Sequence, residues 1–279
     1  MRLGGPIFKP YDDAESWAHA VRTSGYRAAY CPLELVENGS PSECLKLVDA
    51  AKKLDIVIAE VPAWSNPISR DERVRRKAIE LCQRRLELAE RVGANCCINL
   101  AGSNGESKSE PHPENLNSDT FDRIVESVRE IIDAVKPKRT SYVLEMSPWV
   151  HPTSPNSYLR FINKIKREGF AAHLDPVNVV STIHRFYYNA AFLEECFTTL
   201  GPYVRSCHAK DIILRKKLTV QLNEVRPGLG KLDYSKYLRL IEHLDPDMPL
   251  MLEHLKTEKE YTKAADYIRM VAKGIGIAI

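Results

Sequence analysis

The sequence contains no stretch that a membrane or a secretion pathway would require. Its apolar runs fall short of the about 18 residues of a membrane-spanning helix, and the N-terminal segment Met1–Lys9 has no apolar core of the signal-peptide kind. A strong excess of one charge is also missing, because 40 Lys and Arg stand against 37 Asp and Glu. Dedicated nucleic-acid binders usually concentrate positive charge. We therefore expect a cytoplasmic protein whose partner is a small molecule, with neither a membrane nor a nucleic acid involved.

The seven cysteines lack the spacing of a disulfide framework or a thiolate metal site. Their number is odd and no C-x-x-C pair occurs. The adjacent Cys96 and Cys97 would point to opposite faces of a strand, so we expect them to be packing residues. This usage predicts reduced, buried thiols in a cytosolic protein.

A glycine fingerprint of the dinucleotide-binding kind follows none of the predicted strands. Short apolar runs instead alternate with amphipathic helices through the whole chain. The strands are predicted at Met1–Phe8, Tyr26–Cys31, Asp55–Val61 and Cys96–Leu100, and in four further runs that end at Glu145, Asp175, His208 and Glu253. Helices are predicted at Asp12–Gly25, Ser40–Leu54, Asp71–Arg91, Asp119–Val135, Ser154–Lys166, Ala190–Leu200, Asp233–Leu244 and Glu258–Lys273.

Eight strands alternating with eight helices indicate parallel strands with right-handed crossovers, and eight such units close into a barrel. We therefore predict an α/β fold, a (β/α)8 TIM barrel, with residues 1–279 forming a single domain. An open doubly wound sheet is the alternative. The content of charged residues (28%) and hydrophobic residues (44%) is ordinary for a protein that buries a full core.

The last four predicted strands each lead to a side chain that can bind a metal. Tyr142-Val143-Leu144 leads to Glu145, and the other three runs lead in the same way to Asp175, His208 and Glu253. The carboxyl ends of barrel strands meet at one mouth, so these side chains should converge. Any one of them alone would be an ordinary polar strand terminus. Together, three carboxylates and one imidazole predict a site for a divalent cation such as Mn²⁺, Mg²⁺, Co²⁺ or Zn²⁺.

Five short runs in this half of the chain resemble the sugar phosphate isomerase/epimerase family of xylose isomerase-like TIM barrels, which includes ketose 3-epimerases, inosose isomerases and inosose dehydratases. They are Leu144-Glu145, His173-Leu-Asp175-Pro-Val-Asn178, Cys207-His208-Ala-Lys210-Asp211, Pro227-Gly-Leu-Gly230-Lys-Leu-Asp233-Tyr and Leu252-Glu253-His254.

The resemblance implies one divalent metal ion, manganese first, bound by Glu145, Asp175, His208 and Glu253. It also implies that Glu145 and Glu253 transfer a proton at a sugar carbon through an enediolate, one removing the proton and the other returning it. The expected function is thus a metal-dependent isomerase or epimerase acting on a sugar, keto-sugar or inositol derivative. Dimers and tetramers are common in that family, so a homo-oligomer is expected.

Asn178 departs from the family pattern, because the epimerases usually carry a histidine three residues after the aspartate. An amide can bind a sugar hydroxyl but cannot shuttle a proton. A lyase or dehydratase acting on a keto-sugar or 3-keto-glycoside with the same metal site is therefore the alternative. An endonuclease IV-like phosphodiesterase is less favoured, because the early strand exits lack the histidines of a three-zinc cluster. A non-catalytic sugar-binding barrel is disfavoured because both glutamates are present.

Further candidates for substrate contact lie near the predicted mouth. Trp64 could form a sugar-stacking wall or cover the helix layer, and Glu60 could bind substrate or orient a ligand. His173 and His254 are expected to pack between strands and helices, because they neighbour the metal ligands along the chain. The long polar loop 101–117 is expected to be a lid or an oligomer contact. The candidate substrate contacts are Asn178, Lys210, Asp211, Arg215, Trp64 and Glu60.

Overall fold

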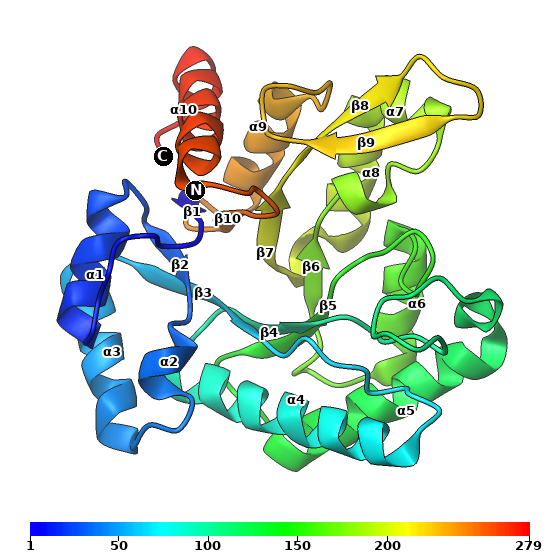
Figure 1. Cartoon of the computed structure of the whole chain (residues 1–279), viewed down its shortest axis with the longest axis horizontal. Coiled ribbons are helices and arrows are strands. Elements are labelled where there is room, and N and C mark those ends of the chain that lie inside the picture. Colours follow the sequence, from blue (N-terminus) through cyan, green and yellow to red (C-terminus); the bar gives the residue numbers. More distant parts are fainter.

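The structure, a computed structural model, describes residues 1–279 and contains an eight-stranded parallel sheet rolled into a barrel (Figure 1). The strands follow one another around the ring in the order β5-β4-β3-β2-β1-β10-β7-β6, and a parallel bridge between Tyr142 and Phe170 joins its two ends. The predicted barrel is thereby confirmed. The barrel strands are β1 (Arg2–Gly4), β2 (Ala28–Tyr30), β3 (Val57–Pro62), β4 (Cys96–Asn99), β5 (Ser141–Leu144), β6 (Ala172–Leu174), β7 (Val204–Ala209) and β10 (Pro249–Leu252).

Helices surround the barrel, and all of them except α2 (Leu33–Val36) and α8 (Asn189–Leu200) begin at a residue whose side chain caps the first turn. The longest, α4 (Glu72–Val92), starts with the Asp71 carboxylate accepting from the backbone N–H groups of Arg73 and Val74, and it ends at Gly93 in the left-handed region. The other helices are α1 (Ala14–Thr23), α2 (Leu33–Val36), α3 (Pro41–Lys53), α5 (Ser118–Val135), α6 (Pro155–Ile165), α7 (Ile183–Tyr187), α8 (Asn189–Leu200), α9 (Tyr234–Leu244) and α10 (Glu258–Gly274), with 3-10 turns η1 (Pro113–Leu116), η2 (Val177–Val179) and η3 (Gly201–Tyr203).

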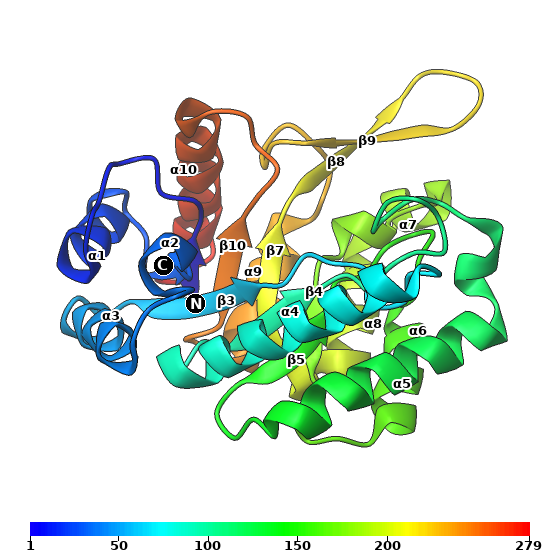
Figure 2. The same cartoon turned by 60° about the horizontal axis from the view of Figure 1, so that its bottom comes forward.

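An antiparallel hairpin, β8 (Asp211–Arg215) and β9 (Gln221–Val225), interrupts the barrel pattern between β7 and α9. Figure 2 shows it standing out from the ring of helices and strands. With no strand or helix predicted between the run that ends at His208 and the helix at Asp233–Leu244, we expected a loop over residues 210–231, and this expectation is wrong for β8 and β9. The hairpin is exposed along much of its length, so its strands carry no clear apolar alternation. It begins directly after β7 and therefore rises from the end of the barrel where the predicted ligands lie.

The barrel is filled by small and medium apolar side chains below its mouth, whereas a separate and larger core lies between the strands and helices. Cys96 belongs to the inner packing and its neighbour Cys97 to the outer core. The predicted opposite orientation of this pair is thus confirmed, and all seven cysteines are free and buried. None of the helices is both long and apolar enough to cross a membrane. Inner packing residues are Cys96, Ile98, Val143 and Ala171 in one cluster, with Ala28, Ala59 and Met251 in a second cluster.

Candidate metal centre

The side chains of Glu145, Asp175, His208 and Glu253 meet at the mouth of the barrel. Each offers a ligand atom, and these atoms all lie within 4.8 Å of one another. His208 Nδ1 is at the centre, 2.8 Å from Glu253 Oε1, 3.4 Å from Glu145 Oε1 and 3.6 Å from Asp175 Oδ2. The predicted gathering is therefore present. We call these four residues the open group, because Glu145 and Glu253 also line a cleft that reaches solvent.

Several ligand atoms of the open group are buried without a hydrogen-bond partner. They are both carboxylate oxygens of Asp175, Nδ1 of His208 and Oε1 of Glu253. Buried polar atoms are normally paired, because losing hydration without a replacement partner is costly. Unpaired oxygens and one unpaired imidazole nitrogen directed at a common point fit the coordination of a divalent cation.

Lys210 places an ammonium group beside the same carboxylates. Its Nζ is 2.7 Å from Asp175 Oδ2, touches Glu253 Oε1 and donates a hydrogen bond to Asn178 Oδ1 at 2.9 Å. Although close, the contact with Asp175 does not have hydrogen-bond geometry. The Asn178 amide in turn donates to Glu145 Oε1 at 3.2 Å. Lys210 and Asn178 thus form a polar bridge between two of the expected ligands.

Opposite charges outweigh burial in setting the pKa values of this group. Burial raises the pKa of a carboxyl, but Lys210 and His208 hold the pKa of Asp175 well below its ordinary value. Glu253 behaves in the same way, with His208 as the main opposing charge, so its pKa is lowered. Burial lowers the pKa of His208 and Lys210, yet the surrounding carboxylates raise both. Without a bound ion, the site is a network of paired charges.

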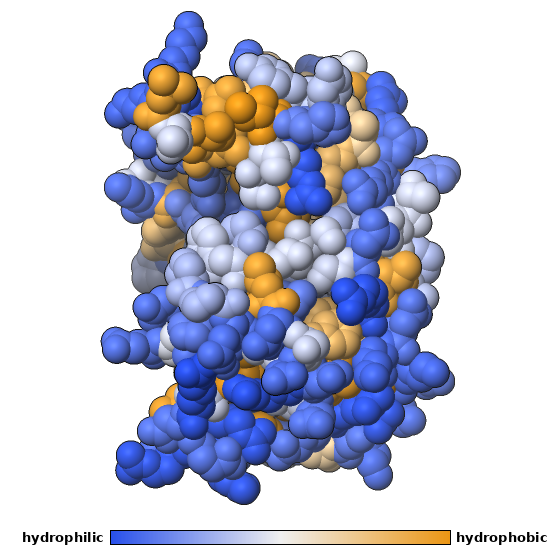
Figure 3. All heavy atoms as spheres, turned by 90° about the vertical axis from the view of Figure 1, so that its right-hand side faces the viewer, coloured by the Kyte–Doolittle hydropathy of each residue, from blue (hydrophilic) through white to orange (hydrophobic).

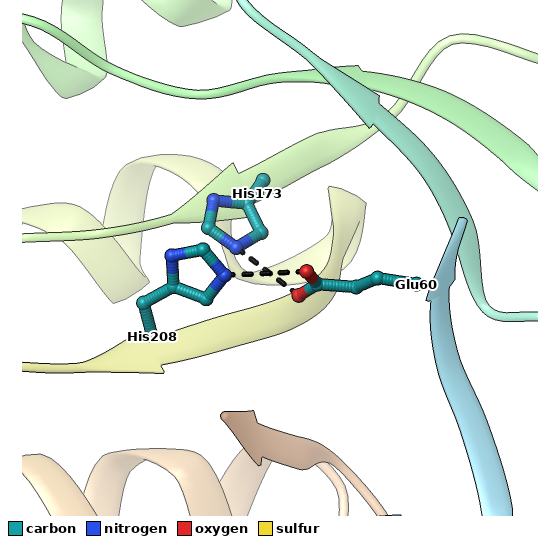
Figure 4. A group of neighbouring side chains, drawn as sticks. All are labelled: Glu60, His173 and His208. Carbon is teal, nitrogen blue, oxygen red and sulfur yellow. Dashed lines mark hydrogen bonds and ion pairs between the residues drawn. The ribbon is translucent and has the colours of Figure 1, made fainter. Parts of the chain in front are cut away.

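A second group of polar residues lies deeper in the barrel, where Glu60, His173 and Ser206 contact one another or His208. Glu60 Oε2 is 3.2 Å from His208 Nε2, and Glu60 Oε1 accepts a hydrogen bond from Ser206 at 2.5 Å. His173 Nε2 approaches Glu60 Oε1 to 3.4 Å, and both imidazoles point at the carboxylate in Figure 4. Glu60, His173 and Ser206 are fully buried, and we call them the sealed group.

The carboxylate of Glu60 fixes which nitrogen of His208 faces the open group. Burial raises the pKa of Glu60, but His208 and His173 together hold it far below the ordinary value, so Glu60 is ionised. An ionised carboxylate at Nε2 favours a proton on that nitrogen and leaves Nδ1 free to act as a ligand. Of the two roles expected for Glu60, its position fits the orientation of a ligand, and Glu60 does not line the cleft.

The prediction that His173 packs between strands and helices is wrong. Side chains two residues apart on a strand point to the same face, and His173 stands two residues before Asp175. It therefore points into the barrel, where its ring lies 4.1 Å from that of His208. The same spacing aligns Ser206 and His208 on β7 with Lys210, which directly follows the strand. This spacing rule, applied to the predicted ligands, would have found His173 and Ser206.

Asp211 is tied to the loop that precedes α9. Its carboxylate accepts hydrogen bonds from the backbone N–H groups of Gly228, Gly230 and Leu232 and from its own neighbour Ile212. A Cβ at Gly230 would lie 2.1 Å from Asp211 Oδ1, so glycine permits this close approach. The geometry is that of a loop anchor, and Asp211 does not line the cleft. Its substrate contact stays a prediction.

The cleft above the open group has a volume of about 930 Å³. Trp64 and Asn178 line it, whereas Arg215 lies at the far end of β8 and lines only hollows on the outer surface of the hairpin. The prediction that His254 packs between strands and helices is wrong. A left-handed backbone turn (φ 58°) directly after Glu253 places the His254 ring in the cleft, where Nδ1 is 3.2 Å from Glu224.

The loop 101–117 contributes Lys108 and Ser109 to the cleft, and a buried amide network holds its base. Asn115 accepts hydrogen bonds from the backbone and side chain of Asn104. The Asn66 side chain donates to the Ser103 carbonyl and accepts from the Ser103 backbone N–H. At its outer part, the Trp149 indole donates to the Ser109 carbonyl at 2.9 Å. The loop thus lies beside the cleft. Its roles as a lid or an oligomer contact stay predictions.

Comparisons with known proteins agree with this architecture. The family model described as xylose isomerase-like TIM barrel matches residues 18–271. A xylose isomerase-like TIM barrel protein from Mycobacterium smegmatis in complex with magnesium is 17% identical with a TM-score of 0.66, covering 95% of this chain and 90% of that chain. D-psicose 3-epimerase from Clostridium cellulolyticum H10, solved with D-tagatose, is 14% identical with a TM-score of 0.69, covering 97% and 99%.

The probable 3-DHS dehydratase AsbF from Bacillus anthracis is also similar, at 15% identity and a TM-score of 0.71, with 98% of this chain and 99% of that chain covered. At such identities the likeness shows the fold alone. A comparison with curated protein sequences finds no significant match.

Proposed function

The chain belongs to the xylose isomerase-like TIM barrel family, and from its site we propose that it is a divalent-metal-dependent isomerase or epimerase acting on a sugar, keto-sugar or inositol derivative. The observation that carries this proposal is the open group: four converging ligands, two of them glutamates at the floor of a cleft. The similar structures include an epimerase and a probable dehydratase, and this chain has a cluster of side chains able to hold a metal.

Glu145, Asp175, His208 and Glu253 would hold the metal ion. Three carboxylates and one imidazole suit Mn²⁺ best in our proposal, with Mg²⁺, Co²⁺ or Zn²⁺ as alternatives, and magnesium is present in one similar structure. When bound, the ion supplies a Lewis acid that polarises a substrate carbonyl and acidifies the neighbouring C–H bond. Glu60 would keep the Nδ1 lone pair of His208 directed at the ion.

Glu145 and Glu253 would then move the proton. They follow β5 and β10, which are separated in the ring by the strands that carry Asp175 and His208. The two glutamates can therefore approach one carbon from different sides, so that one removes a proton and the other returns it. Asn178 steadies Glu145 through its amide N–H, and Lys210 contacts Glu253.

Elimination is the second candidate, because His254 offers an acid at the cleft. The hydrogen bond from His254 to Glu224 is the main reason why the pKa of His254 is raised above its ordinary value. A protonated imidazole beside Glu253 could donate to a leaving group on the carbon next to the deprotonated one. Asn178, fully engaged with Glu145, Met146 and Lys210, offers no such proton. A lyase acting on a keto-sugar or 3-keto-glycoside would use the same ligands.

The test combines metal analysis of the purified protein with deuterium uptake from D₂O into a panel of ketoses, inososes and 3-keto-glycosides. We expect one equivalent of metal, and exchange that is lost with a chelator and in Glu145→Gln or Glu253→Gln. Glu195→Gln, an exposed glutamate on α8, is the matched control and should exchange like the wild type. Release of a leaving group along with exchange would assign the lyase. Failure to bind any divalent metal after reconstitution would refute the site.

A further inference from the structure

The cleft above the open group is larger than a single sugar ring requires. Its volume of about 930 Å³ lies near the top of the ~300–1,000 Å³ range of pockets that enclose drug-sized ligands. Glu145 and Glu253 lie at its floor, so a sugar positioned for proton transfer between them would fill only the deepest part. The remaining volume must accommodate another part of the substrate or stay filled with water.

The walls above the floor are largely apolar. Trp64 and Trp149, from the loops after β3 and β5, are 36% and 44% exposed and both line the cleft. Trp149 is held in place by its hydrogen bond to Ser109. The hairpin after β7 adds Val220 and Leu222. Indole rings and aliphatic side chains left accessible in a cleft favour an aromatic or apolar ligand, because burying them against such a ligand removes apolar surface from water.

The charges of the cleft do not favour an anionic substrate. Its lining includes three glutamates, Glu145, Glu224 and Glu253, but no arginine. Lys108 is the one lysine of the lining, and a single flexible ammonium group is a weak basis for binding a phosphate. His254 is paired with Glu224 and Glu253, and the buried Lys210 is paired with Asp175 and Glu253, so neither offers an unpaired positive charge. A divalent cation at the floor would be largely neutralised by its own carboxylate ligands. An uncharged substrate therefore fits the lining better than a sugar phosphate or a sugar acid.

The apolar wall continues outward along the hairpin. Val220 lines both the cleft and an outer hollow that also contains Ile183 and Leu218, and all three residues are more than two-fifths exposed. The hollow has a basic side as well, formed by Arg215, Lys216 and Lys217. Figure 3 shows apolar surface gathered in the upper part of the face on the hairpin side. An apolar substituent longer than one ring could thus follow this surface out of the cleft.

We propose that the substrate is an uncharged keto-sugar glycoside whose non-sugar part is aromatic or otherwise apolar. The keto-sugar would lie at the open group, and the apolar part would lie between Trp149 and the hairpin residue Leu222. This inference rests on the proposed function, which places the reacting sugar carbon between Glu145 and Glu253.

Binding of stable glycosides tests the substrate class apart from the reaction. Phenyl β-D-glucoside and methyl β-D-glucoside lack the carbonyl and so bind without reacting. We expect calorimetry on the Mn²⁺-loaded protein to give about tenfold or greater preference for the phenyl compound, as burial of a phenyl ring implies. Trp149→Ala and Leu222→Ser should each reduce this ratio to about threefold or less. Phe8→Ala removes an exposed aromatic ring outside the cleft and should leave the ratio unchanged.

Equal affinity for the two glucosides, no binding of either, or tighter binding of glucose 6-phosphate than of both would overturn the proposal. Deuterium uptake into phenyl 3-keto-β-D-glucoside reports separately on the reaction. A phenyl preference without any exchange would refute the proposed function while leaving the ligand class in place. Exchange into free ketoses with no phenyl preference would support the proposed function and refute the proposed ligand class.

Discussion

The open group and the sealed group use the same chemistry in two different environments, and they share the ring of His208. On one side, Nδ1 faces three carboxylates beneath a cleft, and on the other side Nε2 faces Glu60 in the closed interior. The oxygens of Glu60 are engaged by Ser206 and His208, whereas both oxygens of Asp175 lack a hydrogen bond. Unpaired ligand atoms next to an open cleft suit the binding and exchange of a metal ion or substrate. The paired carboxylate of Glu60 suits the orientation of His208, although both ring nitrogens of the neighbouring His173 lack a hydrogen bond.

Loss of a ligand from the open group should have the largest effect. Asp175→Asn keeps the side-chain volume but removes the charge and one of two unpaired oxygens. We expect Mn²⁺ affinity, measured by electron paramagnetic resonance titration, to fall by more than ~100-fold, beyond the effect of changing a residue that only orients a ligand. Asp133→Asn, on the surface beside Arg167, is the control. Wild-type affinity in Asp175→Asn would mean that the group is an ion-pair network only.

Lys210 should matter most when the open group holds no metal. It is fully buried, and its ammonium then compensates Asp175 and Glu253. Lys210→Met should lower the free energy of unfolding in EDTA by about 3–5 kcal/mol, the usual cost of leaving a buried charge unpaired. Saturating Mn²⁺ supplies another cation. Urea denaturation in the presence of Mn²⁺ should therefore show a smaller loss of the free energy of unfolding.

Lys236→Met breaks an exposed pair with Glu194 and should cost less than ~1 kcal/mol in either medium. An equal loss for Lys210→Met with and without Mn²⁺ would show that Lys210 supports the fold independently of the metal ligands.

A change in the sealed group should act on the metal only through His208. Glu60→Gln removes the charge that keeps the proton on Nε2, and we expect Mn²⁺ affinity to fall about 10- to 100-fold. Affinity for phenyl β-D-glucoside should stay within about twofold at saturating Mn²⁺, because Glu60 does not line the cleft. The opposite result, weaker glycoside binding with normal Mn²⁺ affinity, would favour direct substrate contact by Glu60.

The open group was predictable from sequence because each of its members directly follows, or lies within, a short buried strand. Parallel alternation then brings the strand ends to one mouth without any knowledge of loop structure. The sealed group required one more step, since Ser206 and His173 stand two residues before predicted ligands and share their face of the strand. Glu60 was named, but only the register between strands shows that it reaches His208.

Features outside the barrel were less predictable, because they depend on local backbone geometry. The hairpin strands pair with each other, and β9 and the turn before it are largely exposed, so no apolar alternation marks β9. His254 enters the cleft through a left-handed turn that alternation cannot reveal. Asp211 follows the ligand motif directly, yet its carboxylate turns toward the backbone of a loop nineteen residues further along the chain.

The smallest effect should come from Ser206, whose hydroxyl touches only the sealed group. Ser206→Ala removes one hydrogen bond to an ionised carboxylate and should cost about 1.5–3 kcal/mol in urea denaturation. Ser127→Ala removes a buried hydrogen bond to the neutral carbonyl of Pro67 and should cost about 1 kcal/mol. Mn²⁺ affinity of Ser206→Ala should fall less than about fivefold, because Glu60 Oε2 still faces Nε2 of His208. A loss matching that of Glu60→Gln would mean that Ser206, and not the charge of Glu60, holds the carboxylate against the ligand.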